Sequence, residues 1–401
     1  MKKALFLMTA VLALTVSCSK DSEGYWAEGS AKDGSSPSSY EGDGSYEGGS
    51  IGGNGGGGEA GVLTAAEWND LDNWAFWTGV MNNQEWNSSF EMWKFDTSSR
   101  IAIRVKDSAG EPVVNLPVAL YQNQSCLWEA RTSVKGEANC WFGLFPKDIE
   151  PAQDLRLKIG GTLQEDEPVI STGKEDNPVS WNEYVVSVTA PQQKADIAFI
   201  VDATGSMGDE IAFLKEDLLS ILESVRQSQS GVEIRTGTVF YRDKGDDYVI
   251  RHSAFTTDFS STMQFVEKQN ASGGGDLPEA VHTALEATLQ NLAWNPEARS
   301  RLAFLILDAP AHYNQNEVIE SIHLSIAAFA RNGIRIIPVL ASTGDKTTEF
   351  MCRYFAIVTG GTYVFLTDDS GVGNSHLTPT VGQYTVEKLN DLLVRLINEN
   401  I

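Results

Sequence analysis

The stretch that most constrains the fold is residues 197–228, where an apolar run meets a polar turn and then a helical pattern. Ile197–Val201 is apolar at every position, which is typical of a parallel strand buried on both faces. Beyond the turn, apolar residues recur at the spacing of one helical face: Ile211, Leu214, Leu218, Ile221, Leu222 and Val225. This order predicts an α/β sheet, which binds ligands at the carboxyl ends of its strands.

The turn carries oxygen donors at every second position, namely Asp202, Thr204 and Ser206. A carboxylate and two hydroxyls are hard ligands of the kind that suits Mg²⁺. Two further carboxylates stand where they can join them. Asp276 follows three glycines and opens a predicted helix, and Asp308 ends another apolar run. The alternative is that these residues only cap strand ends and form turns.

These three pieces, in this order, resemble the metal-ion-dependent adhesion site of von Willebrand factor A (VWFA) domains. Asp-x-Thr-Gly-Ser-Met, together with Gly-Gly-Gly-Asp-x-Pro-Glu, is most similar to the hemicentin-like and kinase-associated subtype. The resemblance covers residues 194–401 and implies Mg²⁺, or else Mn²⁺ or Ca²⁺, as cofactor. The implied metal ligands are Asp202, Thr204, Ser206, Asp276 and Asp308. Ser272 replaces Asp276 if the second loop is aligned differently.

Three more residues are expected at the rim of this site: Glu279, Tyr241 and Asp243. Glu279 stands in the first turn of the helix after the glycines, where it can also complement the helix dipole. Tyr241 and Asp243 stand at the end of the second strand. His312, four residues past Asp308, is expected to be a solvated loop histidine.

Strand and helix patterns alternate over residues 194–401, which predicts a doubly wound, mostly parallel α/β sheet of Rossmann-like type. Strands are expected near 195–201, 232–241, 248–254, 302–307, 334–340 and 362–366. Helices are expected near 209–227, 259–269, 278–293, 316–331, 347–358 and 385–398. The short link at residues 244–247 predicts an antiparallel hairpin at the sheet edge. The long polar loop 367–382 can carry partner specificity or act as a connector.

Residues 98–190 show the alternation and the turns of an antiparallel β-sandwich. Their spacing resembles Ig-like modules of the carboxypeptidase-regulatory and transthyretin-like types. Residues 134–137 are expected to form a hairpin turn between two strands. Cys126 and Cys140 flank that turn about symmetrically, so a disulfide is expected in an oxidising compartment. Two buried thiols are the alternative.

Residues 1–17 have the order of a lipoprotein signal peptide, with two lysines before an apolar run too short to span a bilayer. Leu14–Cys18 resembles a bacterial lipoprotein box, which implies lipidation of Cys18. The acidic residues that follow resemble export tags of surface lipoproteins in Bacteroidetes-type bacteria. Residues 18–61 are a Gly/Ser-rich tether that cannot bury a core. We therefore expect a lipid-anchored protein of the outer membrane, on the cell surface; an ordinary secretory signal with a chance cysteine is the alternative.

Residues 62–97 hold five of the ten tryptophans. Exposed indoles would stack on sugars, whereas buried ones would fasten the segment to the neighbouring domain, and the second interpretation is favoured because large aromatics are usually buried. Thr64 and Glu67 have the spacing of a capping box, which predicts a short helix here.

The net charge of −24 argues against nucleic acid or anionic lipid as the main partner. The favoured function is metal-dependent adhesion, in which the bound cation captures a protein or another oxygen-donor ligand, with the membrane reached only through the lipid anchor. A structural subunit that uses the β-sandwich as its main contact is the alternative. A metal-dependent hydrolase needs a base or nucleophile near the cation; only Glu279 and His312 qualify, so no enzymatic activity is expected.

Overall fold

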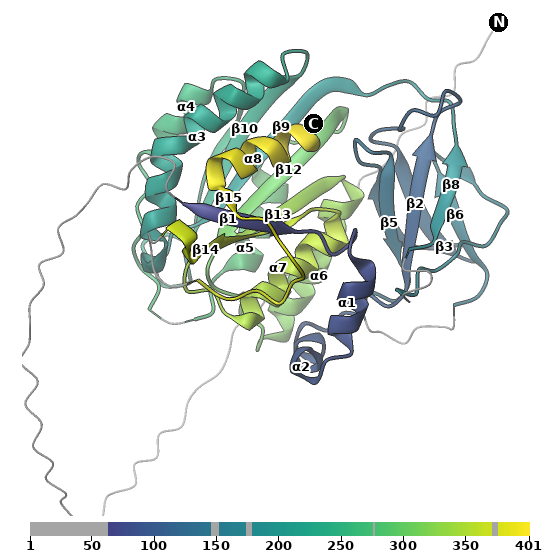
Figure 1. Cartoon of the computed structure of the whole chain (residues 1–401), viewed down its shortest axis with the longest axis horizontal. Helices are drawn as coiled ribbons and strands as arrows, with labels where there is room; N and C mark the ends of the chain where they lie inside the picture. Colours follow the sequence, from purple (N-terminus) through teal and green to yellow (C-terminus); the bar gives the residue numbers. More distant parts are fainter. Residues whose placement is uncertain (1–62, 146–151, 174–178, 276, 371–375) are drawn as a thin grey trace, which may run out of the picture. The chain divides into compact units, whose positions relative to one another are not determined.

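The computed structural model describes residues 63–401, except 146–151, 174–178, 276 and 371–375 (Figure 1). The predicted signal peptide, Cys18 and the tether lie outside the described residues, and so does Asp276. Within the described part of the chain, every helix is too short or too polar to span a bilayer.

One eight-stranded sheet organises the α/β part of the chain, in the order β11-β10-β9-β12-β13-β14-β1-β15. Its strands are β9 (Gln192–Asp202), β10 (Glu233–Tyr241), β11 (Ile250–Thr256), β12 (Ala298–Leu307), β13 (Ile334–Leu340), β14 (Tyr363–Thr367), β1 (Thr64–Trp68) and β15 (Glu387–Lys388). Strands β10, β9, β12, β13 and β14 are parallel to one another, whereas β11 pairs antiparallel with β10 at one edge. The predicted mostly parallel sheet and its edge hairpin are confirmed.

Helices bury their apolar faces on both sides of this sheet. They are α3 (Gly208–Ser228), α4 (Phe259–Val266), α5 (Val281–Asn291), α6 (Asn316–Arg331), α7 (Lys346–Thr359) and α8 (Leu389–Glu399). Alternate residues of β9 enter two separate cores: Phe199 packs with α3, α4 and α8, whereas Ile200 packs with α5, α6 and α7. Each fully buried aliphatic or aromatic side chain of this kind contributes about 1.5–3 kcal/mol. The sheet is therefore doubly wound, as its apolar runs predict.

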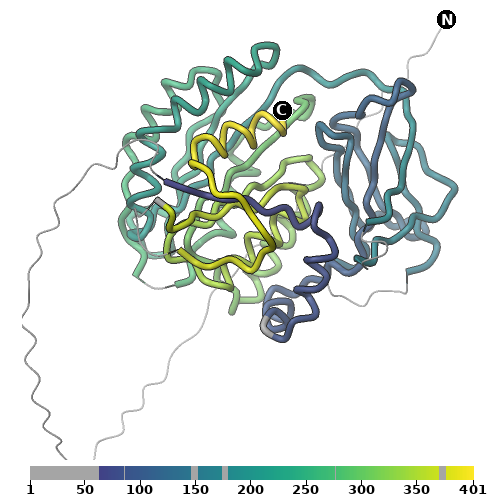
Figure 2. Tube along the Cα trace, viewed as in Figure 1, coloured from purple at the N-terminus to yellow at the C-terminus, as the bar shows by residue number. Residues whose placement is uncertain are grey.

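Strand β1 was not predicted. It pairs antiparallel with β14 and with β15, so the first described residues lie beside the last part of the chain (Figure 2). The capping-box helix expected at Thr64 is wrong, because cross-strand pairing with Thr367 and its neighbours outweighs a local helix signal.

Two short helices, α1 (Trp74–Met81) and α2 (Gln84–Trp93), follow β1. The five tryptophans of this segment are all buried: Trp68, Trp74, Trp77, Trp86 and Trp93. Their indoles fill the core shared with α7 and are not free to stack on a sugar, which agrees with the favoured interpretation.

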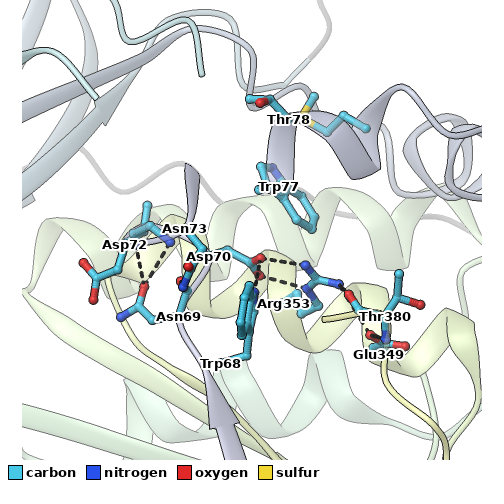
Figure 3. A network of polar contacts seen from close by, with 12 residues as sticks. Trp68, Asn69, Asp70, Asp72, Asn73, Trp77, Thr78, Glu349, Arg353 and Thr380 are labelled. Atoms are coloured by element: carbon cyan, nitrogen blue, oxygen red, sulfur yellow. Dashed lines mark hydrogen bonds and ion pairs between the residues drawn. The ribbon is translucent and has the colours of Figure 1, made fainter. Parts of the chain in front are cut away.

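A buried ion pair fixes this segment to α7 (Figure 3). Arg353 donates from Nε to Asp70 Oδ2 at 2.8 Å and from a terminal nitrogen to Asp70 Oδ1 at 2.6 Å. The guanidinium also lies over the rings of Trp77 and Trp86, at 5.0 and 5.2 Å. Two parallel hydrogen bonds of this kind impose geometry as well as attraction. The segment is thus an integral part of the α/β core.

Residues 98–190 form two further sheets. Their strands are β2 (Arg100–Lys106), β3 (Pro117–Gln122), β4 (Ser125–Arg131), β5 (Glu137–Trp141), β6 (Leu155–Ile159), β7 (Thr162–Leu163) and β8 (Trp181–Val185). The sheet β4-β3-β6-β7 is antiparallel throughout. In β5-β2-β8, however, β8 runs parallel to β2. The antiparallel sandwich expected here is therefore not confirmed as such.

The hairpin expected at residues 134–137 is wrong, because the two flanking strands belong to different sheets: β4 pairs with β3 and β5 pairs with β2. The predicted disulfide is not formed either, and both cysteines are free thiols. Cys126 is exposed on β4, with its Sγ 3.7 Å from the Trp128 carbonyl oxygen, whereas Cys140 is buried on β5. Without a shared ladder, nothing places the two sulfurs opposite each other.

Candidate metal centre

Two carboxylates lie at the carboxyl ends of neighbouring central strands. Asp202 is the last residue of β9, and Asp308 directly follows β12, which pairs with β9 in parallel. Asp202 is fully buried and Asp308 is 5% exposed. Because parallel strands end at the same edge of a sheet, the two groups converge where such sheets bind ligands.

Each of these carboxylates keeps one oxygen without a partner. Asp202 Oδ1 accepts hydrogen bonds from the Thr204 amide at 2.9 Å and the Thr204 hydroxyl at 2.7 Å. Asp308 Oδ2 accepts one from the Thr343 hydroxyl at 3.1 Å. Asp202 Oδ2 and Asp308 Oδ1 are buried and have no hydrogen-bond partner among the described residues. Such oxygens cost free energy unless something satisfies them.

The two hydroxyls of the turn flank the carboxylates. Thr204 is buried, and Ser206, in the short 3₁₀ helix η1 (Gly205–Met207), is exposed. The Ser206 hydroxyl lies near enough to the Asp308 carboxylate to oppose the rise in the pKa of that acid. The turn therefore presents one buried and one accessible hydroxyl beside two acids.

Burial dominates the electrostatics of the site. Burial, with a smaller contribution from the nearby Asp308 carboxylate, raises the pKa of Asp202 to about 7, although the hydrogen bonds from Thr204 oppose the shift. Burial also raises the pKa of Asp308, and the nearby hydroxyls of Ser206 and Thr343 oppose that rise. Acids whose charged form is disfavoured in this way are poised to accept a cation.

The glycine loop expected to complete the site approaches it closely. Gly273, Gly274 and Gly275 all have positive φ, the region that glycine tolerates best. The Gly205 amide donates to the Gly273 carbonyl at 3.1 Å. A Cβ on Gly274 would lie 3.2 Å from the Thr204 Cβ. The loop therefore packs against the Asp202 turn, immediately before the undescribed Asp276.

The three residues expected at the rim are buried instead. Tyr241 is fully buried because its strand, β10, lies between β9 and β11. Glu279 is 2% exposed, and its Oε2 has no partner among the described residues. Burial raises the pKa of Glu279 to about 9, with Asp202 and Asp243 the largest charged contributors. These side chains form the inner wall of the site, and Glu279 adds another acid to it.

His312 is not a solvated histidine, because its Nε2 lies 2.8 Å from Asp243 Oδ1 and both side chains are largely buried. Arg242 holds the loop from the other side. Its Nε donates to the Ala203 carbonyl at 3.0 Å, and a terminal nitrogen donates to the Asn270 carbonyl at 2.7 Å. The first contact fixes the turn that carries Asp202, and the second fixes the loop that leads to the glycines.

A further polar chain at this edge was missed by the sequence analysis. Glu210, in the first turn of α3, accepts hydrogen bonds at Oε1 from the Ser342 amide and hydroxyl, at 3.2 and 3.1 Å. The Ser342 hydroxyl also lies 3.2 Å from His376 Nε2, and His376 Nδ1 lies 2.7 Å from Asp368 Oδ1. The four residues of this polar chain come from separate helices and loops, so no local spacing in the sequence could have predicted that they meet.

The donor set fits a hard divalent cation. In the described part of the chain there is no cluster of three His, Cys, Asp or Glu side chains that could hold an ion by itself. Here, however, hydroxyls stand beside two acids, each with an orphaned buried oxygen. Mg²⁺ and Ca²⁺ accept such all-oxygen sets, and Mg²⁺ usually keeps some of its waters. Asp202, Thr204, Ser206 and Asp308 could therefore hold the cation.

Comparison with known proteins agrees with the fold. Residues 196–349 match the family model of the von Willebrand factor A domain. The chain is 28% identical over 191 residues to an ariadne-like RING finger protein of Acanthamoeba polyphaga mimivirus, covering 44% of this chain and 18% of that protein. It is 32% identical over 121 residues to the alpha-protein kinase vwkA of Dictyostelium discoideum, covering 29% and 19%. The chain thus spans less than a fifth of each of these relatives.

Among solved structures, the proximal thread matrix protein 1 of the mussel byssus matches with a TM-score of 0.34 and 12% identity, over 53% of this chain and 47% of that one. The family model alone supports a von Willebrand factor A domain at residues 196–349.

Proposed function

We propose that this protein is a cell-surface adhesion or capture protein whose VWFA domain binds a divalent cation and uses it to hold a partner. The observation that carries the proposal is the pair of buried, unpartnered oxygens on Asp202 and Asp308, beside the Thr204 and Ser206 hydroxyls. A cation is the simplest group that satisfies both oxygens at once.

The accessible side of the site suits an interaction with a partner. Ser206 is exposed, whereas Asp202 and Thr204 are buried, so the protein would hold the cation from below. A cation bound in this way keeps one coordination position toward solvent, usually filled by water. An oxygen donor from a partner, such as a carboxylate, could replace that water. The favoured cation is Mg²⁺, with Mn²⁺ and Ca²⁺ as alternatives.

The anchoring that we propose comes from the sequence alone. Cys18 would carry the lipid, and residues 18–61 would hold the domain away from the outer membrane by roughly 35 Å. Such a tether lets a surface domain search for partners while it stays attached.

Interferometry tests this function with two immobilised peptides, one acidic and one neutral but rich in hydroxyls. Binding of the mature chain to each peptide is measured in Mg²⁺ and in EDTA. We expect binding that needs Mg²⁺ and is lost in Asp308→Asn. Equal binding of the parent in EDTA would refute the proposal.

A hydrolase is the second candidate, because Ser342, His376 and Asp368 are hydrogen-bonded in the order of a nucleophile, a base and an orienting acid. It ranks second because the Ser342 hydroxyl is also bound to Glu210 and its side chain is 4% exposed. Labelling with a fluorophosphonate probe decides the point: labelling that is lost in Ser342→Ala would favour the hydrolase.

A further inference from the structure

A polar cleft of about 640 Å³ lies at the opposite edge of the same sheet. Its lining includes residues near the amino ends of β13 and β14 and the carboxyl ends of α7 and α8. On the other side it is lined by Arg131 and Lys135 of the 98–190 module. The candidate metal centre lies at the carboxyl ends of these strands, so the cleft is a separate site.

Arg335, the second residue of β13, lines this cleft and has an unsatisfied charge. It is only 5% exposed, yet its guanidinium has no hydrogen bond or ion pair with any described residue. Burial alone lowers its pKa to about 10, with no acid near enough to oppose the effect. Arginine stays protonated under such conditions, so the charge persists and lacks a counterion.

Other cations gather around Arg335 without carboxylate partners. Arg131 and Arg301 both donate to the neutral side chain of Asn115. Burial, together with the positive charges of Arg131 and Arg335, lowers the pKa of Arg301 to about 10, although the charges of Asp196 and Glu297 oppose the shift. Arg100, also lining the cleft, donates to Asn139 Oδ1 and to the Leu71 carbonyl. Like charges held together in this way are destabilising unless an anion binds.

The acids that line the cleft are mostly paired with arginines other than Arg335. Arg395 pairs with three of them, Glu67, Glu387 and Glu399. Glu137 pairs with Arg104. Asp72 is left, and it raises the pKa of Arg100, not of Arg335. None of the acids that line the cleft is therefore a partner of Arg335, although the net charge of the chain is −24.

We propose that this cleft binds a hydroxyl-bearing oxyanion, an acidic sugar such as a uronate or a sugar sulfate, with Arg335 as its anchor. The planar guanidinium matches a carboxylate or sulfate through two parallel hydrogen bonds. The amides of Asn69, Asn73, Asn139 and Gln383 also line the cleft, and amides suit sugar hydroxyls. The volume is within the range of small-molecule sites.

Isothermal titration calorimetry of the mature chain at low salt tests the proposal, with glucuronate, glucose 6-sulfate, inorganic sulfate and neutral glucose as probes. We expect the two charged sugars to bind more tightly than inorganic sulfate, and glucose not to bind. Whichever charged sugar binds more tightly identifies the anionic group. Failure of both, or equal binding of glucose, would overturn the proposal.

Variants locate the site. Arg335→Met should weaken the charged sugar roughly ten- to hundredfold, the loss expected for hydrogen bonds to a charged group. Arg131→Met serves if Arg335→Met does not fold, and should weaken binding at least several-fold. Arg331→Met is the matched control, because Arg331 ends α6, is exposed and does not line the cleft. Unchanged binding in Arg335→Met, or in Arg131→Met where only that variant folds, would refute the assignment.

The test also separates the cleft from the metal centre. Binding of the charged sugar should be the same in EDTA and in Asp202→Asn, because Asp202 lies at the other edge of the sheet. Loss of sugar binding in both conditions would place the anion on the cation and contradict the proposed cleft.

Discussion

Single side chains at the carboxyl edge of the sheet carry most of the functional information. Four buried acids there keep an oxygen with no partner among the described residues: Asp202, Glu210, Glu279 and Asp308. Burying an acid without a partner costs free energy relative to leaving it hydrated, so folding alone does not favour these positions. Their shared position supports the proposed cation site.

Replacing one of these acids by its neutral amide should increase the stability of the metal-free protein and decrease its affinity for the cation. Asp202→Asn keeps the shape but removes a charge that burial disfavours, so the metal-free melting temperature should rise by about 2–4 °C per kcal/mol gained. Mg²⁺ affinity should fall at least tenfold, because a carboxylate ligand becomes an amide.

Calorimetry and thermal melts with and without Mg²⁺ measure both effects. Asp258→Asn is the matched control: Asp258 caps α4 by accepting from the Ser260 amide, and asparagine caps equally well. Mg²⁺ affinity unchanged in Asp202→Asn would remove Asp202 from the metal set.

The same acids predict how stability depends on pH. The pKa of Asp202 rises from 3.8 to about 7 on folding, and that of Glu279 from 4.5 to about 9. The folded state therefore binds more protons than the unfolded state between these values, so metal-free stability should fall as the pH rises from about 4 to 9. Mg²⁺ should offset the loss progressively, since it stabilises the ionised acids.

Chemical denaturation across that pH range, in EDTA and in Mg²⁺, checks the sign. A metal-free chain that is more stable at pH 8 than at pH 5 would contradict the assignment.

At the scale of helices and strands, sequence patterns succeeded where each element carries its own periodicity. The predicted strand 334–340 coincides with β13, and the predicted helix 316–331 coincides with α6. Strand β1 was not predicted because its partner, β14, lies about three hundred residues away in the sequence, and no local pattern indicates such a pairing. The hairpin predicted at residues 134–137 was wrong for a related reason. Tertiary packing, not the local sequence, decides that β4 and β5 belong to different sheets.

The buried ion pair that fastens the N-terminal segment should be essential to it. Asp70→Asn removes the nearer of the two acids that pair with the buried Arg353 guanidinium and leaves only Glu349, at 3.4 Å, so the cost should approach the roughly 3–5 kcal/mol of breaking a buried pair. Hydrogen exchange should show lost protection in β1 and α1 before the central strands.

Lys194→Met provides the comparison, because the Lys194–Glu233 pair is exposed and its loss should cost less than about 1 kcal/mol. An equal effect of both substitutions would mean that the segment is held by its tryptophans alone.

For the molecule as a whole, the sequence predicted the candidate metal centre better than its surroundings. Asp202, Thr204, Ser206 and Asp308 are recognisable because the motif lies on local strand–turn elements. Asp276 is not described, so its part in the site stays a prediction. Glu279 and Tyr241 were placed at the rim, although β10 and the following turn bury them. Arg335 could not be predicted as a binding residue from the sequence, because a single arginine in an apolar strand forms no recognisable motif. Its position in the cleft is seen only in the folded structure.

The last prediction concerns anchoring of the whole protein. If Cys18 is acylated, the mature chain should be labelled by a radioactive fatty acid and should sediment with the outer membrane. Each buried methylene contributes about 0.8 kcal/mol, so stable attachment needs more than one acyl chain. Cys18→Ala should abolish labelling and leave the protein soluble or unprocessed. Cys126→Ala is the matched control, because Cys126 is an exposed free thiol that a less specific reaction would also modify. Persistent labelling of Cys18→Ala would show that the lipid is elsewhere, and labelling that is reduced only in part by each substitution would point to nonspecific thiol acylation.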